Sequence, residues 1–392
     1  MKKLPLLLLA AAFGSLPVSA QFRLSGHIGG MPDSLRLAVV NVENPDNTRL
    51  ICTTYPTDGA FTLMSDSLTQ PTVCELRLQR HAPKMERFTT LCSARFVASA
   101  HPMQLEPTTM KALEDASDDY RTEQAMRITG GEAQEGWNTY LNEVFETERA
   151  AKLAGYKQAQ VYFDTNNNPD SVRKYRILEK EANARLLQAR VDFARRHPAS
   201  IPAAYWMDRE ICTLFIHSAE ELESMAALVQ ACPDTARVNA VNRHLQTALK
   251  YALHRPYVDF DLTLPDGQTA RFSSLVPKEA DYTLVDFWAS WCSPCRAAIP
   301  HVKEMGAKYG RRLGILSISV DRKEADWRKA MGEEGMTWPQ AWLKGSQMNT
   351  VADAYVIQSI PRLLLIDCEG RIVVSTYLPD EITEYIQKNI TL

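Results

Sequence analysis

The 392-residue sequence has little net charge and, after its first twenty residues, no long apolar run. Its 44 basic residues nearly balance 47 acidic ones, and the formal charge of −3 gives no sign of a nucleic-acid partner. No segment after residue 20 is long and apolar enough to span a bilayer. We therefore expect no nucleic-acid partner and no transmembrane segment in the mature chain.

The sequence also lacks the spacing patterns of metal and haem sites. Apart from one C-x-x-C motif, its eight cysteines are scattered, without the close pairs of a zinc site. Arg296, rather than a histidine, follows that motif, which excludes haem attachment there. We read the histidines of the central region as surface or capping residues, namely His197, His217, His244 and His254. The sequence thus predicts no metal site and no cofactor.

Residues 1–20 have the layout of a secretory signal peptide. Two lysines are followed by an apolar run over residues 4–13 and by small residues that predict cleavage after Ala20. The run is short for a membrane span, which favours a cleaved signal peptide over the alternative of an uncleaved anchor. We therefore expect a periplasmic protein that begins at Gln21.

The length and changes in composition predict several domains after the signal peptide. Residues 21–107 carry short alternating apolar segments between turn signals, typical of a small all-β sandwich or barrel. In residues 108–254 glycine and proline become rare and helical periodicity predicts an all-α segment, with strong helices at 170–197, from Ser218 onward and at 234–251. The amphipathic helices either pack on each other or form a surface for clients. Residues 255–392 alternate strands and helices, which predicts an α/β domain with a mixed sheet.

The six cysteines outside the C-x-x-C motif show no spacing that implies chemistry. We expect most of them to be small buried hydrophobic residues. A disulfide among Cys52, Cys74 and Cys92 is the alternative, because sequence does not give connectivity. Cys368 lies in a predicted hairpin turn, where we expect it to be exposed. The two remaining ones are Cys212 and Cys232.

The chemistry of the chain is concentrated in residues 283–300, which read T-L-V-D-F-W-A-S-W-C-S-P-C-R-A-A-I-P. The short apolar run predicts a buried strand, and Pro294 suits the first turn of a helix. Cys292 then lies at a helix N-terminus, where the dipole and unpaired N–H groups favour its thiolate. Cys295, one turn further, is placed to attack a mixed disulfide on Cys292. The pattern predicts dithiol–disulfide exchange, with an inert disulfide as the alternative.

This stretch resembles the active site of thioredoxin-fold proteins. Asp286 matches the buried acid of the family, two tryptophans precede the cysteines, and Pro300 matches the kink of the following helix. Residues 359–361, Ser-Ile-Pro, resemble the family's cis-proline segment. The long segment between the two motifs resembles the extracytoplasmic TlpA/ResA-like branch. The layout of a β-domain before the thioredoxin module resembles some Bacteroidetes-type secreted proteins.

The resemblance implies a role for each residue of the motif. Cys292 is the expected nucleophile, Cys295 the resolving thiol, and Asp286 a proton shuttle, for which a satisfied core acid is the alternative. Trp291 is expected to form a flat apolar rim for substrate, with core packing as its alternative, whereas Trp288 is expected in the core. The substrate segment is expected to pair with the backbone of Ile360 beside a cis Pro361.

The implied function is an extracytoplasmic thiol-disulfide oxidoreductase that reduces substrate proteins and draws electrons from a membrane-bound thiol reductase. A thiol peroxidase of peroxiredoxin type is one alternative, but Ala289 stands where that family has threonine. A non-enzymatic surface scaffold is the other. One departure from the family is the absence of its late glycine in residues 377–379, so part of the substrate groove is expected to differ.

Overall fold

The computed structural model describes residues 22–43, 47–68, 70–118, 120–164, 169–213, 217–355, 357 and 359–390. The predicted signal peptide lies outside these ranges. The chain divides into two compact units, Met1–Trp206 with Ala231–Asp234, and Met207–Gln230 with Thr235–Leu392. This division runs through the predicted helical segment, so a separate domain at 108–254 stays a prediction.

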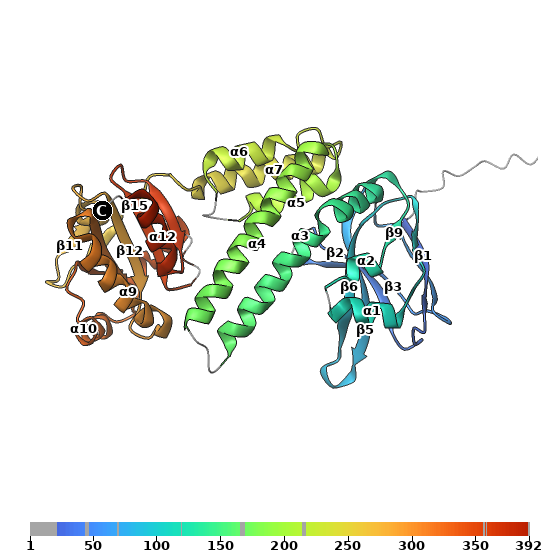
Figure 1. Ribbon diagram of the computed structural model, residues 1–392, viewed down its shortest axis with the longest axis horizontal. Helices are drawn as coiled ribbons and strands as arrows, with labels where there is room; N and C mark the ends of the chain where they lie inside the picture. Colours follow the sequence, from blue (N-terminus) through green and yellow to red (C-terminus); the bar gives the residue numbers. More distant parts are fainter. Residues whose placement is uncertain are drawn as a thin grey trace, which may run out of the picture. The chain divides into compact units, whose positions relative to one another are not determined.

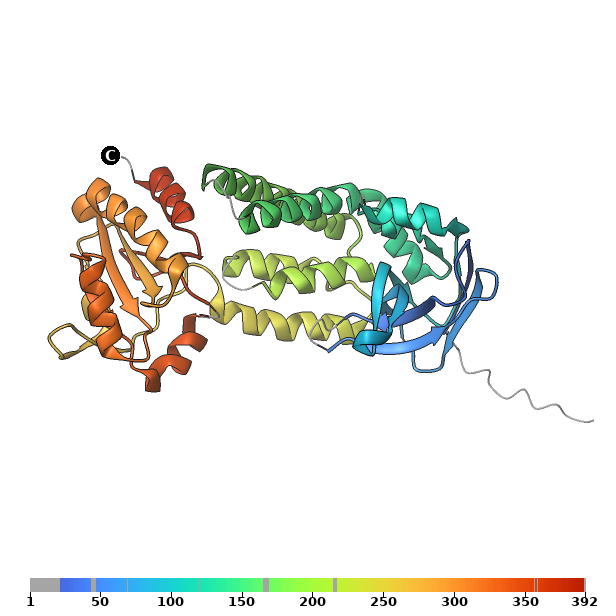
Figure 2. The same cartoon turned by 90° about the horizontal axis from the view of Figure 1, so that it is seen from below.

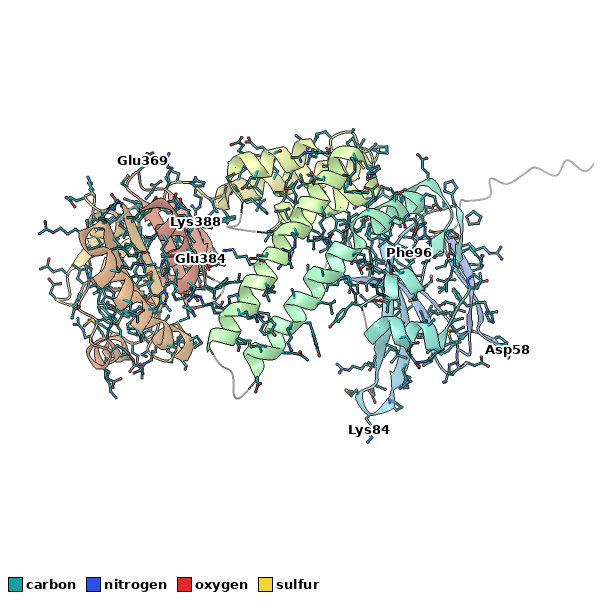
Figure 3. All side chains as sticks on the ribbon, viewed as in Figure 1. Asp58, Lys84, Phe96, Glu369, Glu384 and Lys388 are labelled. Atoms are coloured by element: carbon teal, nitrogen blue, oxygen red, sulfur yellow. A yellow bond between two sulfur atoms is a disulfide. The ribbon has the colours of Figure 1, made fainter. Side chains whose placement is uncertain are left out.

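The amino-terminal part of the first unit is a β-sandwich, as predicted (Figure 1). One sheet has the order β4-β1-β7-β9, with β8 paired to β1, and the other has the order β3-β2-β5-β6. Inward-facing residues of both sheets, such as Phe22, Leu37 and Phe96, share one core. Figure 3 marks Phe96 and, at the tip of the β5–β6 hairpin, Lys84. The strands are β1 (Phe22–Gly29), β2 (Arg36–Asn41), β3 (Arg49–Thr54), β4 (Ala60–Ser65), β5 (Thr72–Ala82), β6 (Arg87–Ala98), β7 (Pro102–Leu105), β8 (Thr108–Thr109) and β9 (Ile128–Thr129).

Two long helices follow the sandwich in the first unit and lie side by side (Figures 1 and 2). The second of them confirms the helix predicted at 170–197, because its periodicity and the proline that ends it are both local signals. The first, 32 residues long, and a later helix, α5, were not predicted individually. The helices of this region are α1 (Met110–Asp118), α2 (Thr122–Ala125), α3 (Glu132–Phe163), α4 (Pro169–Arg196) and α5 (Ile201–Ile211). The residues of α5 after Trp206 belong to the second unit.

A buried charge network joins these helices to the sandwich. Glu148 on α3 accepts hydrogen bonds from Arg95 on β6 and from the hydroxyl of Tyr140, and lies 3.5 Å from Arg190 on α4. Burial alone would raise the pKa of Glu148, but Arg95 and the other nearby cations hold it well below its usual range. Both arginines also lie against the ring of Trp206, at 4.8 and 3.6 Å from its centroid.

The second unit contains two helices that confirm the predicted ones, α6 (Ala219–Ala227) and α7 (Thr235–Ala248). The predicted capping box is present at α6. The hydroxyl of Ser218 accepts the N–H of Glu221, and the carboxylate of Glu221 accepts the N–H of Ser218. A local sequence signal of this kind is independent of the rest of the fold.

The rest of the second unit is a seven-stranded mixed sheet covered by helices, as predicted. The strand order is β11-β10-β14-β13-β12-β15-β16, in which β12, β13 and β14 run parallel and the outer strands pair antiparallel. The short strand β14 was not predicted. The strands are β10 (Asp261–Thr263), β11 (Thr269–Arg271), β12 (Tyr282–Trp288), β13 (Leu313–Ser319), β14 (Gln340–Trp342), β15 (Arg362–Asp367) and β16 (Ile372–Thr376). The helices are α8 (Phe272–Leu275), α9 (Ser293–Tyr309), α10 (Glu324–Glu333), α11 (Gly345–Tyr355) and α12 (Pro379–Asn389).

The central strand β12 sends its side chains alternately to the two faces of this sheet. Val285 and Phe287 pack in the core that includes residues of α8 and α11. Leu284 packs with α9 and α12, and Trp288 packs with the start of α9 and with α10. Asp286 alternates with Val285 and Phe287 and therefore points to the face covered by α9. No helix among the described residues is long and apolar enough to cross a bilayer.

We predict that Glu148→Gln destabilises the first unit by about 3–5 kcal/mol, because it removes a buried negative charge that compensates both Arg95 and Arg190. Arg95 keeps its ion pair with Glu123, at 2.7 Å. The matched control is Glu146→Gln, whose side chain is 61% exposed and pairs with Arg121 at the surface. That change is expected to cost less than about 1 kcal/mol. Urea unfolding followed by circular dichroism measures both, and equal losses would contradict a dominant role for the buried network.

Candidate active site

The two cysteines of the C-x-x-C motif lie where β12 ends and α9 begins, as the sequence predicted. Cys292 caps α9, and its Sγ accepts the backbone N–H of Cys295 at 3.2 Å. The two residues are joined by a disulfide, with 5.3 Å between their Cα atoms, and both are buried. The sulfur of Cys292 therefore occupies the position at which a helix N-terminus favours negative charge.

The two tryptophans before the motif have opposite environments. Trp288 is fully buried in the cluster that contains both cysteines, as expected. Trp291, immediately before Cys292, is 68% exposed. This exposure excludes core packing for Trp291 and leaves a large apolar ring at the surface next to the disulfide.

The Ser-Ile-Pro segment, about seventy residues downstream, lies next to the cysteines in space. Ile360 packs against the cluster that includes Cys292 and Cys295. The peptide bond between Ile360 and Pro361 is cis, and both residues are partly buried. β15 begins directly afterwards and pairs with β12, which positions this segment beside the motif.

Asp286 is a buried acid with one hydrogen-bond donor, the hydroxyl of Ser317 on the neighbouring strand, at 3.2 Å. The indole N–H of Trp338 donates in turn to the same hydroxyl oxygen at 2.9 Å. Burial raises the pKa of Asp286 to about 7, and the bond from Ser317 offsets only part of this effect. An acid with this pKa exchanges protons readily at neutral pH, which suits a proton shuttle on the face of the sheet covered by α9.

A second buried carboxylate, Asp321, holds the loop that carries the cysteines, and sequence analysis missed it. Its two oxygens accept the backbone N–H of Ser290 at 3.0 and 3.2 Å, and one accepts the hydroxyl of Ser290 at 2.7 Å. The hydroxyl of Ser319 donates to the other at 2.8 Å. Asp321 is only 2% exposed, so these bonds fix the path of the chain between Trp288 and Cys292. The signal available in sequence was only its place after an apolar strand.

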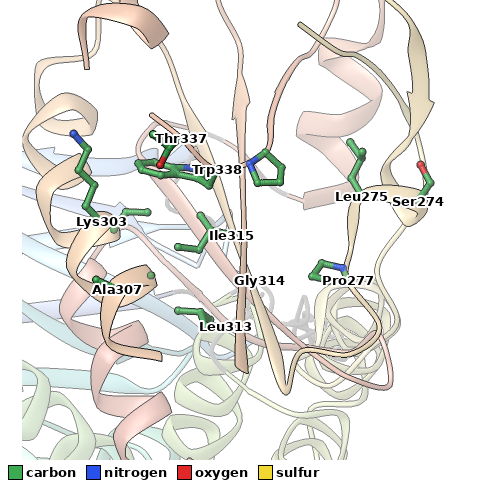
Figure 4. Close-up of a pocket in the computed structure, with 13 residues that line it drawn as sticks. Ser274, Leu275, Pro277, Lys303, Ala307, Leu313, Gly314, Ile315, Thr337 and Trp338 are labelled. Carbon is green, nitrogen blue, oxygen red and sulfur yellow. The ribbon is translucent and has the colours of Figure 1, made fainter. Parts of the chain in front are cut away.

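One cavity of this unit lies outside the predicted site. It has a volume of about 670 Å³ and is lined by α9, the start of β13 and the segments around Pro277 and Trp338 (Figure 4). None of the six predicted site residues lines it. Trp338 connects this cavity to Asp286, because its indole N–H donates to the hydroxyl of Ser317, which in turn donates to Asp286.

The remaining six cysteines follow the prediction only in part. Cys74, Cys92 and Cys232 are buried, and Cys368 is exposed in the hairpin turn as expected. Cys52 is half-buried and Cys212 is exposed, so buried cysteines are not the majority that was predicted. The alternative of a disulfide among the first three cysteines was wrong, because Cys52, Cys74 and Cys92 are thiols.

One of the histidine predictions was wrong, because His217 is buried rather than at the surface. His244 is exposed, as predicted. It shows no metal-like spacing in sequence but lies beside Asp208 and Cys212 in space. The structure brings this histidine to residues more than thirty positions away, which no local pattern indicates.

The family model described as thioredoxin-like matches residues 280–372. This segment contains the disulfide, Asp286 and the cis-proline segment described above. The carboxy-terminal part of the chain therefore contains a thioredoxin-like domain. It is similar to the thiol-disulfide oxidoreductase ResA of Oceanobacillus iheyensis, with 29% identity over 128 residues, which are 32% of this chain and 58% of that protein.

Two further comparisons involve the same domain. ResA of Geobacillus thermodenitrificans is 25% identical over 157 residues, which are 36% of this chain and 88% of that protein. The thioredoxin domain of a thiol-disulfide oxidoreductase from Bacteroides vulgatus is 27% identical, with a TM-score of 0.33, and the match covers 36% of this chain and 99% of that one. The chain spans about three fifths of the length of the curated relatives that it first matches.

The raised pKa of Asp286 predicts a stability that falls as pH rises. The unfolded carboxyl loses its proton near pH 3.9, whereas the folded one keeps it up to about pH 7. Protonation thus stabilises the folded state, and this contribution, on the order of 4 kcal/mol, is lost between these two pH values. An amide does not titrate in this range, so Asp286→Asn is expected to abolish this pH dependence. The free energy of unfolding of the variant is then expected to rise relative to that of the parent from pH 4 to pH 8.

Urea unfolding of the oxidised chains at several pH values measures this difference. Asp353→Asn is the control, because it makes the same chemical change at an exposed position of α11. Parallel pH profiles for the parent and Asp286→Asn would contradict a raised pKa at Asp286.

Proposed function

We propose that this protein is an extracytoplasmic thiol-disulfide oxidoreductase that exchanges the Cys292–Cys295 couple with substrate proteins. The observation that carries the proposal is the position of Cys292, whose sulfur both caps α9 and forms the disulfide with Cys295. The similarity to proteins named thiol-disulfide oxidoreductase supports the same reaction class. The signal-peptide pattern of residues 1–20 supports a periplasmic location.

In the reducing direction, the thiolate of Cys292 attacks one sulfur of a substrate disulfide. This step forms a mixed disulfide and releases the other substrate sulfur as a thiolate. The thiolate of Cys295 then attacks the sulfur of Cys292, which closes the Cys292–Cys295 disulfide and releases the second substrate thiol. Two electrons pass from the dithiol to the substrate.

Asp286 acts as the base for the buried resolving thiol in this scheme. Cys295 is 2% exposed, so solvent has little access to its proton. Asp286 points to the face of the sheet that α9 covers, and its pKa of about 7 lets it accept this proton and later return it.

Substrate contacts come from the exposed surface around Cys292. Trp291 offers a flat apolar face, and the backbone at Ile360, before cis Pro361, is a candidate edge for an extended substrate segment. The electron donor that fits this scheme is a membrane-bound thiol reductase, which would regenerate the dithiol after each cycle.

We predict that the chain reduces insulin disulfides in the presence of dithiothreitol and that Cys292→Ser abolishes this activity. Cys295→Ser is expected to accumulate the mixed disulfide, because the resolving step is lost. Cys368→Ser is the control, since it removes an exposed thiol in the same unit. Insulin turbidity and mass spectrometry of trapped complexes provide the readouts. Activity that survives Cys292→Ser would overturn the proposed function.

The reducing direction is tested by equilibrating the couple with glutathione. Related couples span about −270 to −120 mV, and a reductase is expected toward the negative end of that range. Quantifying the oxidised fraction by thiol alkylation gives the potential. A value near −120 mV would assign the protein to disulfide formation instead.

A further inference from the structure

Three side chains of the second unit, none of them part of the proposed redox site, converge at the junction of two helices. Asp208 belongs to α5, Cys212 follows the last residue of that helix, and His244 belongs to α7. One donor atom from each of the three lies within 4.8 Å of those of the other two. Nδ1 of His244 is 2.7 Å from a carboxylate oxygen of Asp208.

The helices explain why the three donors meet. Asp208 and Cys212 are four residues apart, so they project from one face of α5 and its end. His244 reaches the same point from α7, about one turn before that helix ends at Ala248. The side chains of Asp208 and His244 are 24% and 45% exposed, and Cys212 is exposed, so solvent ions have access.

The chemistry of the three donors selects one class of ion. Thiolate, imidazole and carboxylate are the three ligand types of protein-bound zinc. Calcium and magnesium use oxygen ligands and have no preference for a thiolate or an imidazole. Donors bound to zinc lie about 3.3–3.8 Å apart in a tetrahedron with bonds of about 2.0–2.3 Å, so small side-chain rotations bring these three into range. The hydrogen bond between Asp208 and His244 explains why these two side chains meet, but it does not explain why the thiol of Cys212 lies beside them.

We propose that Asp208, Cys212 and His244 form a binding site for Zn²⁺, with the fourth coordination position open to water. The bound ion fastens the end of α5 to α7. Because the ion binds the folded arrangement of two separate helices, it stabilises the folded chain in proportion to its affinity. The proposal does not depend on the redox function of the C-x-x-C motif.

The test uses Co²⁺ as a spectroscopic probe in the full chain carrying Cys292→Ser and Cys295→Ser, kept reduced with a phosphine. These two changes remove the thiols of the redox site as competing ligands. Addition of Co²⁺ is expected to give a sulfur-to-metal charge-transfer band that saturates at one ion per chain and disappears when Zn²⁺ is added. Zn²⁺ is also expected to raise the melting temperature.

Three variants and one control identify the ligands. Cys212→Ser is expected to abolish the band, and His244→Gln and Asp208→Asn to weaken Co²⁺ binding by about ten-fold or more. Cys368→Ser, at the other exposed cysteine, is expected to change neither the band nor the affinity. Circular dichroism checks that each variant is folded.

Two outcomes overturn the site. One is the absence of a charge-transfer band and of any thermal shift with Zn²⁺ in the parent chain. The other is a band that survives Cys212→Ser, or an affinity that His244→Gln leaves unchanged, either of which places the metal on other residues.

Discussion

The geometry of the redox loop depends on a carboxylate that takes no part in the proposed chemistry. Asp321, at the end of β13, accepts the N–H and hydroxyl of Ser290 and so ties the loop after β12 to the neighbouring strand. Because strands β12 and β13 run parallel, their carboxyl ends meet at one edge of the sheet. The cysteines follow directly from this edge. Without the tie, the start of α9 would have fewer constraints on where it presents Cys292.

Three of the buried carboxylates in the described part of the chain are stabilised in three different ways. Glu148 is compensated by arginines, which keep it charged. Asp321 is compensated by hydrogen bonds from Ser290 and Ser319. Asp286 receives a single hydroxyl bond from Ser317, and its pKa rises accordingly. Of these three acids, the one with the poorest compensation is thus on the strand that leads to the redox cysteines, which suits the proton exchange proposed for it.

The sequence predicted those parts of the structure that local signals specify. The run from β12 into α9, the capping box at Ser218 and the proline after α4 are all encoded within a few neighbouring residues. The resemblance to a family added what spacing alone did not give, namely the approach of Ile360 to the cysteines. By contrast, the Asp321–Ser290 contact joins residues 31 positions apart, and the cluster at His244 spans 36, so both depend on tertiary packing.

Two elements were not predicted because their residues carry no recognisable local pattern. Strand β14 contains three residues, too few for a periodic pattern to appear. Its existence follows from pairing with β13, which supplies the neighbouring strand. Helix α5 is largely buried, so it lacks the polar face from which an amphipathic pattern is recognised.

The capping of α9 by Cys292 couples the redox state of the domain to the integrity of this helix. A sulfur in a disulfide is a weak acceptor for the N–H of Cys295, whereas a thiolate at the same place carries a full negative charge. By a thermodynamic cycle, the added strength of this interaction stabilises the folded reduced chain, and by the same amount it favours electron uptake by the folded oxidised chain. A substitution that frays the first turn of α9 therefore has to shift the unfolding free energy of the two redox forms by different amounts.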